Sequence, residues 1–276
     1  MSKLLHRLRR AGRRAREILG SRWQGGHPCG ACGFPGRPLP RQVLWPELVA
    51  QWELTPQWAA WMDDREGSRC ARCGATRRGS QLAQAVVAEI NRVTGMQARS
   101  LRAATADRRC RRVAIAEINS AANLHKYLSR CAGLRYSEYG STDPSVPSED
   151  LTRLSYADAS FDIAITSDTM EHVPDVDAAF REVRRVLKPG AAYVFSIPVV
   201  WDRATRARAV LRNGELVHLL PPSHHGAAGD GRNDMLVFHE FGSDVVERCR
   251  ATGFDVELLR SDDNPALVTF VARRPS

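Results

Sequence analysis

The sequence lacks a long hydrophobic run: no window of its 276 residues approaches 18 uninterrupted apolar residues. That absence rules out a membrane-spanning helix. No internal repeat is visible, and a composition of 43% hydrophobic and 26% charged residues excludes collagen-like, mucin-like and mostly disordered chains. A chain of this length can bury a substantial core and corresponds to one large domain or two smaller ones.

The positive charge is concentrated at one end. Of the formal net charge of +9, residues 1–23 carry +7, so the remainder of the chain is nearly balanced. A helix here would separate a modest apolar stripe from an Arg-rich face and could contact RNA or an anionic membrane surface, although a solvated helix or frayed terminus is the commoner outcome. The apolar block is too short for a signal peptide, and we expect a cytoplasmic protein.

Four of the seven cysteines form two closely spaced pairs, Cys29-Gly-Ala-Cys32 and Cys70-Ala-Arg-Cys73. Each two-residue gap closes a tight knuckle, and two such pairs can hold one Zn²⁺ tetrahedrally. Two disulfides are disfavoured because there is no secretion signal, and a redox pair is disfavoured because there are two pairs. We expect a structural zinc site, because four thiolates leave no coordination position open for a substrate.

The residue pattern divides the chain into four parts. We expect a basic amphipathic arm over residues 1–25, a four-cysteine module over 26–80, a helical linker over 81–112 and an α/β domain over 113–276. Within the module, Thr55-Pro56 predicts the start of a helix. Residues 98–112, rich in Arg and Ala without a strong period, predict a surface linker.

From Val113 onward, short apolar runs alternate with helical patterns, which is typical of βαβ units and a parallel sheet. The expected strands cover residues 113–116, 134–136, 161–166, 192–198, 254–259 and 266–272. The expected helices cover residues 122–131, 177–187 and 243–252.

One run within this last part carries a family resemblance. Asp150-Leu-Thr-Arg-Leu-Ser-Tyr-Ala-Asp-Ala-Ser-Phe-Asp162 is followed by Ile-Ala-Ile-Thr-Ser-Asp-Thr-Met-Glu171-His172-Val-Pro and then by Arg184-Arg-Val-Leu-Lys-Pro-Gly190. In this order, the landmarks resemble the class I S-adenosylmethionine-dependent methyltransferases, and more narrowly the type 11 methyltransferase domain. The resemblance covers about residues 113–276. It implies an α/β fold, a Rossmann-like methyltransferase sheet with helices on both faces, preceded here by the four-cysteine zinc-binding module.

The resemblance also implies S-adenosylmethionine as cofactor and a set of residues that contact it. After Glu117, the family would show glycines at three positions where this chain has Asn119, Ala121 and Asn123. Asparagine tolerates a positive φ better than other non-glycine residues, and alanine is the smallest alternative, so the turn could survive around a narrower pocket. The remaining expected contacts are Glu138 to the ribose hydroxyls, Asp150 and Leu151 to the adenine, and Ser167 beside the cofactor.

Methyl transfer from a sulfonium chiefly requires alignment of the acceptor, and a base helps only when the acceptor is a hydroxyl or a protonated amine. His172 stands where the family would place that base, and a loop or packing histidine is an equal alternative. In the insertion before the last helix, His224, His225 and His239 could form a second metal site or a substrate clamp, although a mobile lid with incidental histidines is favoured. The segment Trp201-Asp202-Arg203 could contact the acceptor.

We therefore expect an S-adenosylmethionine-dependent methyltransferase with a structural zinc module, acting on an unidentified small-molecule or sugar acceptor. The missing glycines favour an alternative, a catalytically degenerate binding protein that engages RNA or a membrane through its basic arm and zinc module. A third hypothesis keeps the enzyme and makes RNA its acceptor.

Overall fold

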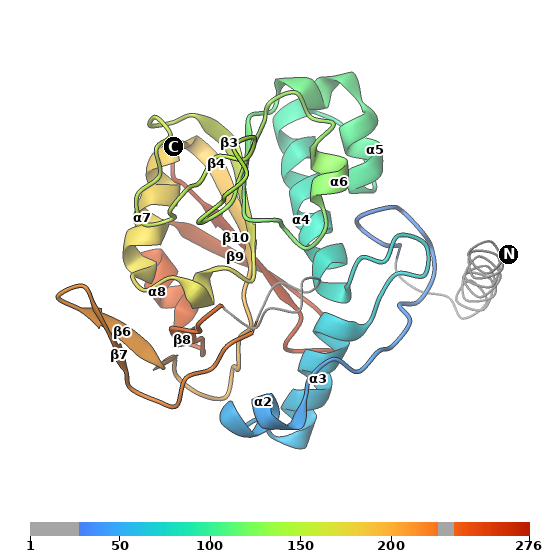
Figure 1. Ribbon diagram of the computed structural model, residues 1–276. Coiled ribbons are helices and arrows are strands. Elements are labelled where there is room, and N and C mark those ends of the chain that lie inside the picture. The colour runs from blue at the N-terminus through green and yellow to red at the C-terminus, as the bar shows by residue number, and fades with distance from the viewer. Residues whose placement is uncertain (1–27, 226–234) are drawn as a thin grey trace, which may run out of the picture.

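The hydrophobic runs from Ile115 onward form one six-stranded sheet at the centre of the molecule (Figure 1). The computed structural model describes residues 28–225 and 235–276, so the predicted basic arm lies outside the described residues. In spatial order the strands are β2 (Leu134–Ser137), β1 (Ile115–Ile118), β3 (Phe161–Ser167), β4 (Leu187–Ser196), β10 (Val268–Arg273) and β9 (Asp255–Arg260). The first four are parallel, and β10 runs antiparallel to both of its neighbours.

The strand order determines where a ligand can bind. The chain passes from β1 outward to β2 and then returns to place β3 on the other side of β1. In open α/β sheets, ligands bind beyond the carboxyl ends of the strands at the point where this order reverses. The loops that follow Ile118 and Ser167 therefore lie at the expected site.

Helices cover both faces of the sheet, because alternate side chains of a strand point to opposite faces. The helices are α4 (Arg77–Thr94), α5 (Leu101–Ala106), α7 (Val176–Val186) and α8 (Val245–Ala251). Ile163 and Ile165 of β3 share a core with α4 and α5, whereas Ala164 between them shares a core with α7 and α8. Figure 1 shows the two pairs on opposite sides of the sheet. The predicted α/β, Rossmann-like fold is confirmed.

The surface linker predicted over residues 98–112 is correct for its exposed arginine cluster, but the segment also has a buried helical side. These residues form α5 and a 3-10 helix, η1 (Arg108–Arg112), and the side chains of Leu101, Ala104 and Cys110 are buried. This apolar pattern is short and interrupted by many arginines, so it is difficult to detect in the sequence. The preceding helix, α4, packs on β3, β4 and β10, so one face of this helix belongs to the core of the domain.

The amino-terminal module contributes α2 (Pro46–Gln51) and α3 (Pro56–Gly67). The predicted helix start is confirmed: the Oγ1 of Thr55 accepts a hydrogen bond from the amide of Trp58 at 3.2 Å. Trp58 and Met62 of α3 pack against Val200 and Ala266, which follow β4 and precede β10. The module is thereby attached to the sheet.

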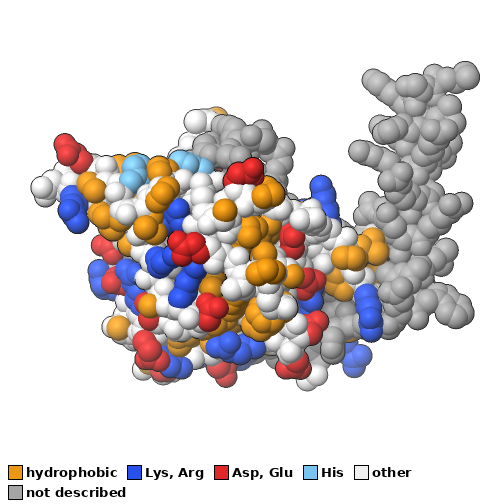
Figure 2. Space-filling view, turned by 90° about the horizontal axis from the view of Figure 1, so that it is seen from below, with side chains coloured by type: hydrophobic (Ala, Val, Ile, Leu, Met, Phe, Trp, Pro, Cys, Tyr) orange, Lys and Arg blue, Asp and Glu red, His pale blue; other side chains and the backbone are white. Residues whose placement is uncertain are grey.

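Shorter elements complete the fold. They are α6 (His125–Leu128), η2 (Met170–His172), β5 (Arg206–Ala207) paired with β8 (His239–Glu240), and a hairpin of β6 (Ala209–Arg212) and β7 (Glu215–His218). Within residues 28–225 and 235–276, no helix has the length and hydrophobicity to cross a membrane. On the face drawn in Figure 2, basic and acidic side chains are interspersed, as expected for a body of nearly balanced charge.

Candidate functional site

The four paired cysteines converge on one point. Cys29 Sγ lies 3.8 Å from Cys73 Sγ, and Cys32 Sγ lies 3.7 Å from Cys70 Sγ. All four sulfurs lie within 4.8 Å of one another, and the cysteines are free thiols. A tetrahedral ion with Zn–S bonds of about 2.3 Å would separate its sulfurs by about 3.8 Å. The donor set and its spacing therefore fit a zinc ion.

Both cysteine knuckles turn on a glycine. Gly33 and Gly74 each follow one pair and have φ angles of 76° and 75°. Each glycine amide donates to the carbonyl of the first cysteine of its pair, at 2.7 Å and 2.8 Å. The second knuckle lies between α3 and α4 in the chain.

The loop after β1 makes its turn without glycine. Asn119 and Asn123 have φ angles of 59° and 61°, and Ala122 has a φ of 50°. Ala121 is fully buried. A glycine lies on the other side of this contact, in α4. A Cβ added to Gly79 would lie 3.1 Å from the carbonyl oxygen of Ala122, so Gly79 allows α4 to approach the loop closely. The turn is kept, with α4 packed directly behind it.

Glu117 supports this loop from within the sheet. It is fully buried on β1, its Oε1 accepts from the amide of Ala121 at 3.1 Å, and its Oε2 lies 2.7 Å from His125 Nδ1. Burial raises the pKa of Glu117, and the hydrogen bond with His125 opposes that shift. Both oxygens are engaged within the protein, so this side chain positions the loop backbone.

The other predicted cofactor residues lie on adjacent loops at the same edge. Glu138 follows β2 and is partly exposed, Asp150 is exposed, and Leu151 is buried. The loops after β1 and β2 are joined where Asn119 Oδ1 accepts from the amide of Tyr139 at 2.8 Å. The amide of Glu149 donates to the carbonyl of Glu138 at 3.2 Å, so Asp150 lies close to the end of β2.

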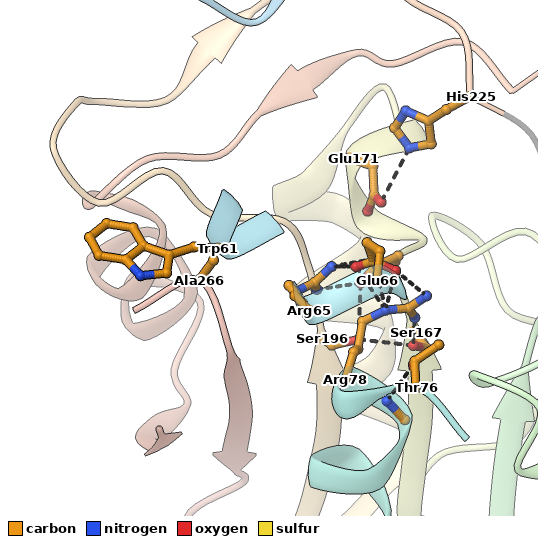
Figure 3. Close-up of polar contacts among 12 residues, drawn as sticks. Trp61, Arg65, Glu66, Thr76, Arg78, Ser167, Glu171, Ser196, His225 and Ala266 are labelled. Carbon is orange, nitrogen blue, oxygen red and sulfur yellow. Dashed lines mark hydrogen bonds and ion pairs between the residues drawn. The ribbon is translucent and has the colours of Figure 1, made fainter. Parts of the chain in front are cut away.

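At the end of β3, the site is built jointly by the sheet and the amino-terminal helices (Figure 3). Ser167 Oγ lies 2.9 Å from Ser196 Oγ and accepts from Arg78 of α4. Asp168 accepts two hydrogen bonds from the buried Arg65 of α3, each of 2.7 Å. Burial opposes the ionisation of Asp168, but the charges of Arg65 and Arg78 hold its pKa below the ordinary value.

This contribution from α3 and α4 was not predicted from the sequence. Glu66 contacts Arg65 and forms an ion pair with Arg78 at 2.9 Å. These three side chains therefore form one charged cluster at the end of β3. A signal was present: Arg65 follows Trp58 and Met62 at helical spacing on the buried face of α3. A charged residue within such a stripe indicates a buried partner.

Beyond β3, η2 places His172 at the same end of the sheet. Its Nδ1 lies 2.9 Å from the carbonyl oxygen of Leu236 and donates to it, which leaves Nε2 as an acceptor. Burial lowers the pKa of His172, so its ring is neutral near pH 7. The ring of His225 lies against it, with ring centroids 4.7 Å apart.

The three histidines of the insertion do not share one site. His225 faces Glu171, His224 is exposed, and His239 is buried with its Nε2 3.2 Å from the carbonyl oxygen of Pro174. A metal site or clamp made by the three together is therefore wrong. Of the suggested lid, residues 226–234 lie outside the described part of the chain.

Asp202 and Arg203, considered above as acceptor contacts, attach the amino-terminal module to the sheet. Trp58 Nε1 donates to Asp202 Oδ2 at 2.6 Å, and Arg203 Nη1 donates to the carbonyl of Trp52 at 2.8 Å. Trp201 Nε1 donates to the carbonyl of Pro265 at 3.0 Å. These polar groups thus serve contacts within the fold.

The chain is similar to a known protein family over part of its length. A family model described as a methyltransferase domain matches residues 94–195, which run from the end of α4 through β4. The chain is similar to this family over that segment, as the methyltransferase prediction requires, and the segment contains the loops after β1, β2 and β3.

The individual relatives are more distant. Dimethylglycine N-methyltransferase of Parasynechococcus marenigrum (strain WH8102) is 34% identical over 95 residues, which are 30% of this chain and 34% of the relative. The chain thus spans about a third of the length of this curated relative.

Two solved structures are also similar in fold. Burkholderia thailandensis 1,6-didemethyltoxoflavin-N1-methyltransferase, solved with 1,6-didemethyltoxoflavin and S-adenosylhomocysteine, has a TM-score of 0.43 at 15% identity, covering 87% of this chain and 96% of that one. An S-adenosylmethionine-dependent methyltransferase from Mesorhizobium loti has a TM-score of 0.37 at 18% identity, covering 59% and 91%.

Proposed function

We propose that this protein is an S-adenosylmethionine-dependent methyltransferase that acts on a small-molecule acceptor through a hydroxyl group. One observation carries the proposal: within the segment matched by the methyltransferase family, polar residues of three loops gather where the strand order reverses. The curated relative is named for dimethylglycine, a small molecule, which supports an acceptor of this size. A sugar remains within the proposed class.

The loop residues fit a bound nucleoside. The turn at Asn119, Ala121 and Asn123 directly follows β1 at the carboxyl end of the sheet, the place of a cofactor-binding turn in such folds. Glu138, partly exposed, is proposed to accept the ribose hydroxyls, and Asp150 is proposed to meet the adenine amine. When bound, S-adenosylmethionine would supply the methyl group from its sulfonium.

The end of β3 fits the other half of the cofactor. Ser167 is proposed to line this part, and Arg78 beside it offers a guanidinium, which suits a carboxylate. In the structure Arg78 is paired with Glu66, so a bound carboxylate would compete with that side chain. Next to this group, His172 is proposed to engage the acceptor and promote loss of its hydroxyl proton.

We further propose that the four cysteines hold a structural zinc ion. The thiol spacing supports this, and the second knuckle lies between the helices that carry Arg65 and Arg78. The ion would fix those helices and take no part in methyl transfer, since four protein ligands close its coordination. All seven cysteines are free thiols, which favours a reducing, cytoplasmic location.

The alternative, binding of RNA or membrane through residues 1–23 by a protein without methyltransferase activity, remains a separate hypothesis. Those residues lie outside the described part of the chain. Failure of cofactor binding would favour it, and the association would then weaken with added salt.

A pair of matched substitutions tests the cofactor site. Asp150 and Asp143 are both exposed, and each accepts a hydrogen bond from the amide two residues ahead at 2.8 Å. Both Asp150→Ala and Asp143→Ala therefore remove the same local turn contact. In calorimetric titrations with S-adenosylhomocysteine, we expect about tenfold weaker binding for Asp150→Ala, equivalent to about 1.4 kcal/mol, and wild-type affinity for Asp143→Ala. Equal affinities of the two variants would contradict the proposed placement of the adenine.

A further inference from the structure

Glu171 is a buried carboxylate without a hydrogen-bond partner. Its side chain is fully buried in η2, and neither Oε1 nor Oε2 accepts a hydrogen bond. Burying an ionised carboxylate is costly unless it is paired or coordinates a metal. The structure therefore leaves two buried acceptor oxygens that a cation beside them would satisfy.

Two histidines face that carboxylate from different parts of the chain, and Figure 3 shows one of them, His225, with Glu171. His172 Nε2 lies 3.9 Å and His225 Nε2 lies 3.8 Å from Glu171 Oε1. The ligand atoms of all three residues lie within 4.8 Å of one another. The Nδ1–H of His172 donates to the carbonyl of Leu236. In metal sites, a hydrogen bond of this kind fixes the ring of a histidine ligand and leaves Nε2 available to the metal.

The segment that carries His225 is held in place by the amino-terminal module. Trp52, which ends α2, donates from Nε1 to Ser223 Oγ at 3.1 Å. The ring of Trp52 also lies 6.0 Å from the ring of His225, measured between centroids. The position of His225 over η2 is thus supported by contacts outside the insertion itself.

We propose that Glu171, His172 and His225 bind one divalent transition-metal ion of the zinc class. Two imidazoles and one carboxylate are a donor set that zinc uses in catalytic sites, where a fourth position stays open. A tetrahedral zinc site with such ligands has donor separations of about 3.4 Å, and the two distances from the histidines to Glu171 Oε1 exceed this value by about 0.5 Å. The dication also neutralises Glu171, and its open position distinguishes it from the four-cysteine site.

The use of this ion in catalysis rests on the proposed function. With a hydroxyl acceptor, the acceptor oxygen would occupy the open position and lose its proton to solvent. The new C–O bond then forms as the S–CH₃ bond breaks, and S-adenosylhomocysteine is released. His172 would in this case act as a ligand, and the ion would make the hydroxyl acidic.

Counting bound zinc tests the site without reference to activity. Full-length protein is equilibrated with excess Zn²⁺, dialysed and analysed by mass spectrometry for metal content. We expect two ions per wild-type chain and one per chain of His225→Ala. His224→Ala is the matched control because its exposed side chain is the adjacent residue, and it should retain two. Glu171→Gln, which preserves the size of the side chain, should also lose one ion and serves if His225→Ala does not fold.

Cobalt substitution identifies which ion is lost. Thiolate-to-cobalt charge-transfer absorption should persist in His225→Ala, because the cysteine site is intact. A wild-type chain that binds one ion and shows those thiolate bands would overturn the proposal, as would two ions in both His225→Ala and Glu171→Gln. S-adenosylhomocysteine binding is measured separately, so a missing second ion with normal cofactor affinity speaks against this site and leaves the proposed function standing.

Discussion

The turn after β1 shows how single residues set the geometry of the site. Asn119, Ala122 and Asn123 adopt positive φ angles that glycine would take without strain. Their side chains are small or amide-bearing, and Asn119 gains a compensating hydrogen bond from the amide of Tyr139. The backbone therefore keeps its course into the site although all three positions carry a Cβ.

Asn123 allows a clean test of this backbone requirement, because its side chain is exposed and its φ is 61°. We expect Asn123→Val to lower the free energy of unfolding by about 1–2 kcal/mol, since a β-branched residue is strained in the left-handed region. Asn123→Gly should stay within about 0.5 kcal/mol of the wild type, because relief of strain offsets the greater freedom of the unfolded chain. Urea denaturation measures both, and equal stability of the valine and glycine variants would show that the turn does not need this conformation.

Features that depend on local residue chemistry were predicted correctly from the sequence. Asparagine at positions 119 and 123 predicted tolerance of positive φ, and the spacing of the cysteines predicted that their thiols converge. The roles of Arg65 and Arg78 were not predicted, because their hydrogen-bond partners lie about a hundred residues away, on β3 and just beyond it. No local pattern states which distant element a helix will contact.

Among the elements, α4 has the largest role in joining the two halves of the protein. Its N-cap, Thr76, lies just beyond the second cysteine knuckle, its first turn carries Arg78, and its buried face packs on the sheet. Near its end, Glu89 accepts from Arg273 of β10 at 2.6 Å and from Arg92 at 2.8 Å. This buried carboxylate ties the helix to the strand.

The Glu89 contact predicts a pH-dependent stability. Burial opposes the ionisation of Glu89, but hydrogen bonds from Arg273 and Arg92 hold its pKa below the ordinary value. Because the folded-state pKa is lowered, the stabilisation is complete above the unfolded value of about 4.3 and is lost as the pH falls through the folded value. We expect Glu89→Gln to be about 1–3 kcal/mol less stable than the wild type at pH 7, with the difference shrinking below about pH 4.

Denaturant unfolding across this pH range checks the Glu89 prediction. Glu247→Gln is the control, because Glu247 forms an exposed pair with Arg250 one turn along α8 and should change stability by less than about 0.5 kcal/mol. A difference between Glu89→Gln and the wild type that stays constant down to pH 3 would contradict the assignment.

Element prediction succeeded where hydrophobic periodicity was strong. The strand predicted over residues 161–166 is β3, and the helix predicted over 177–187 is α7, each within one residue at both ends. Of the helix predicted over 122–131, only α6 is observed. Ala122 and Asn123 adopt positive φ angles in the turn after β1, and the residues after Leu128 form a loop. The β6–β7 hairpin was missed, since its exposed leucines do not alternate with polar residues in the manner of a half-buried strand.

In the whole molecule, the cysteine module and the sheet share one hydrophobic core. Cys29, Phe34 and Cys70 belong to the same cluster as Leu82 of α4 and Ile163 of β3. The sequence indicated two adjacent modules, because residues 26–80 and the sheet-forming residues differ in composition. Their fusion depends on tertiary contacts such as the hydrogen bond from the amide of Leu101 to the carbonyl of Gly30, 2.8 Å long, which spacing alone does not reveal.

We propose above that the site formed by the sheet, α3 and α4 binds S-adenosylmethionine despite its glycine-free turn. Calorimetric titration of the intact, zinc-loaded protein with S-adenosylhomocysteine tests it most directly. We predict one site per chain with micromolar affinity, about −8 kcal/mol. A folded, zinc-loaded protein that binds no S-adenosylhomocysteine would contradict the claim and would make the sheet a scaffold for a different activity.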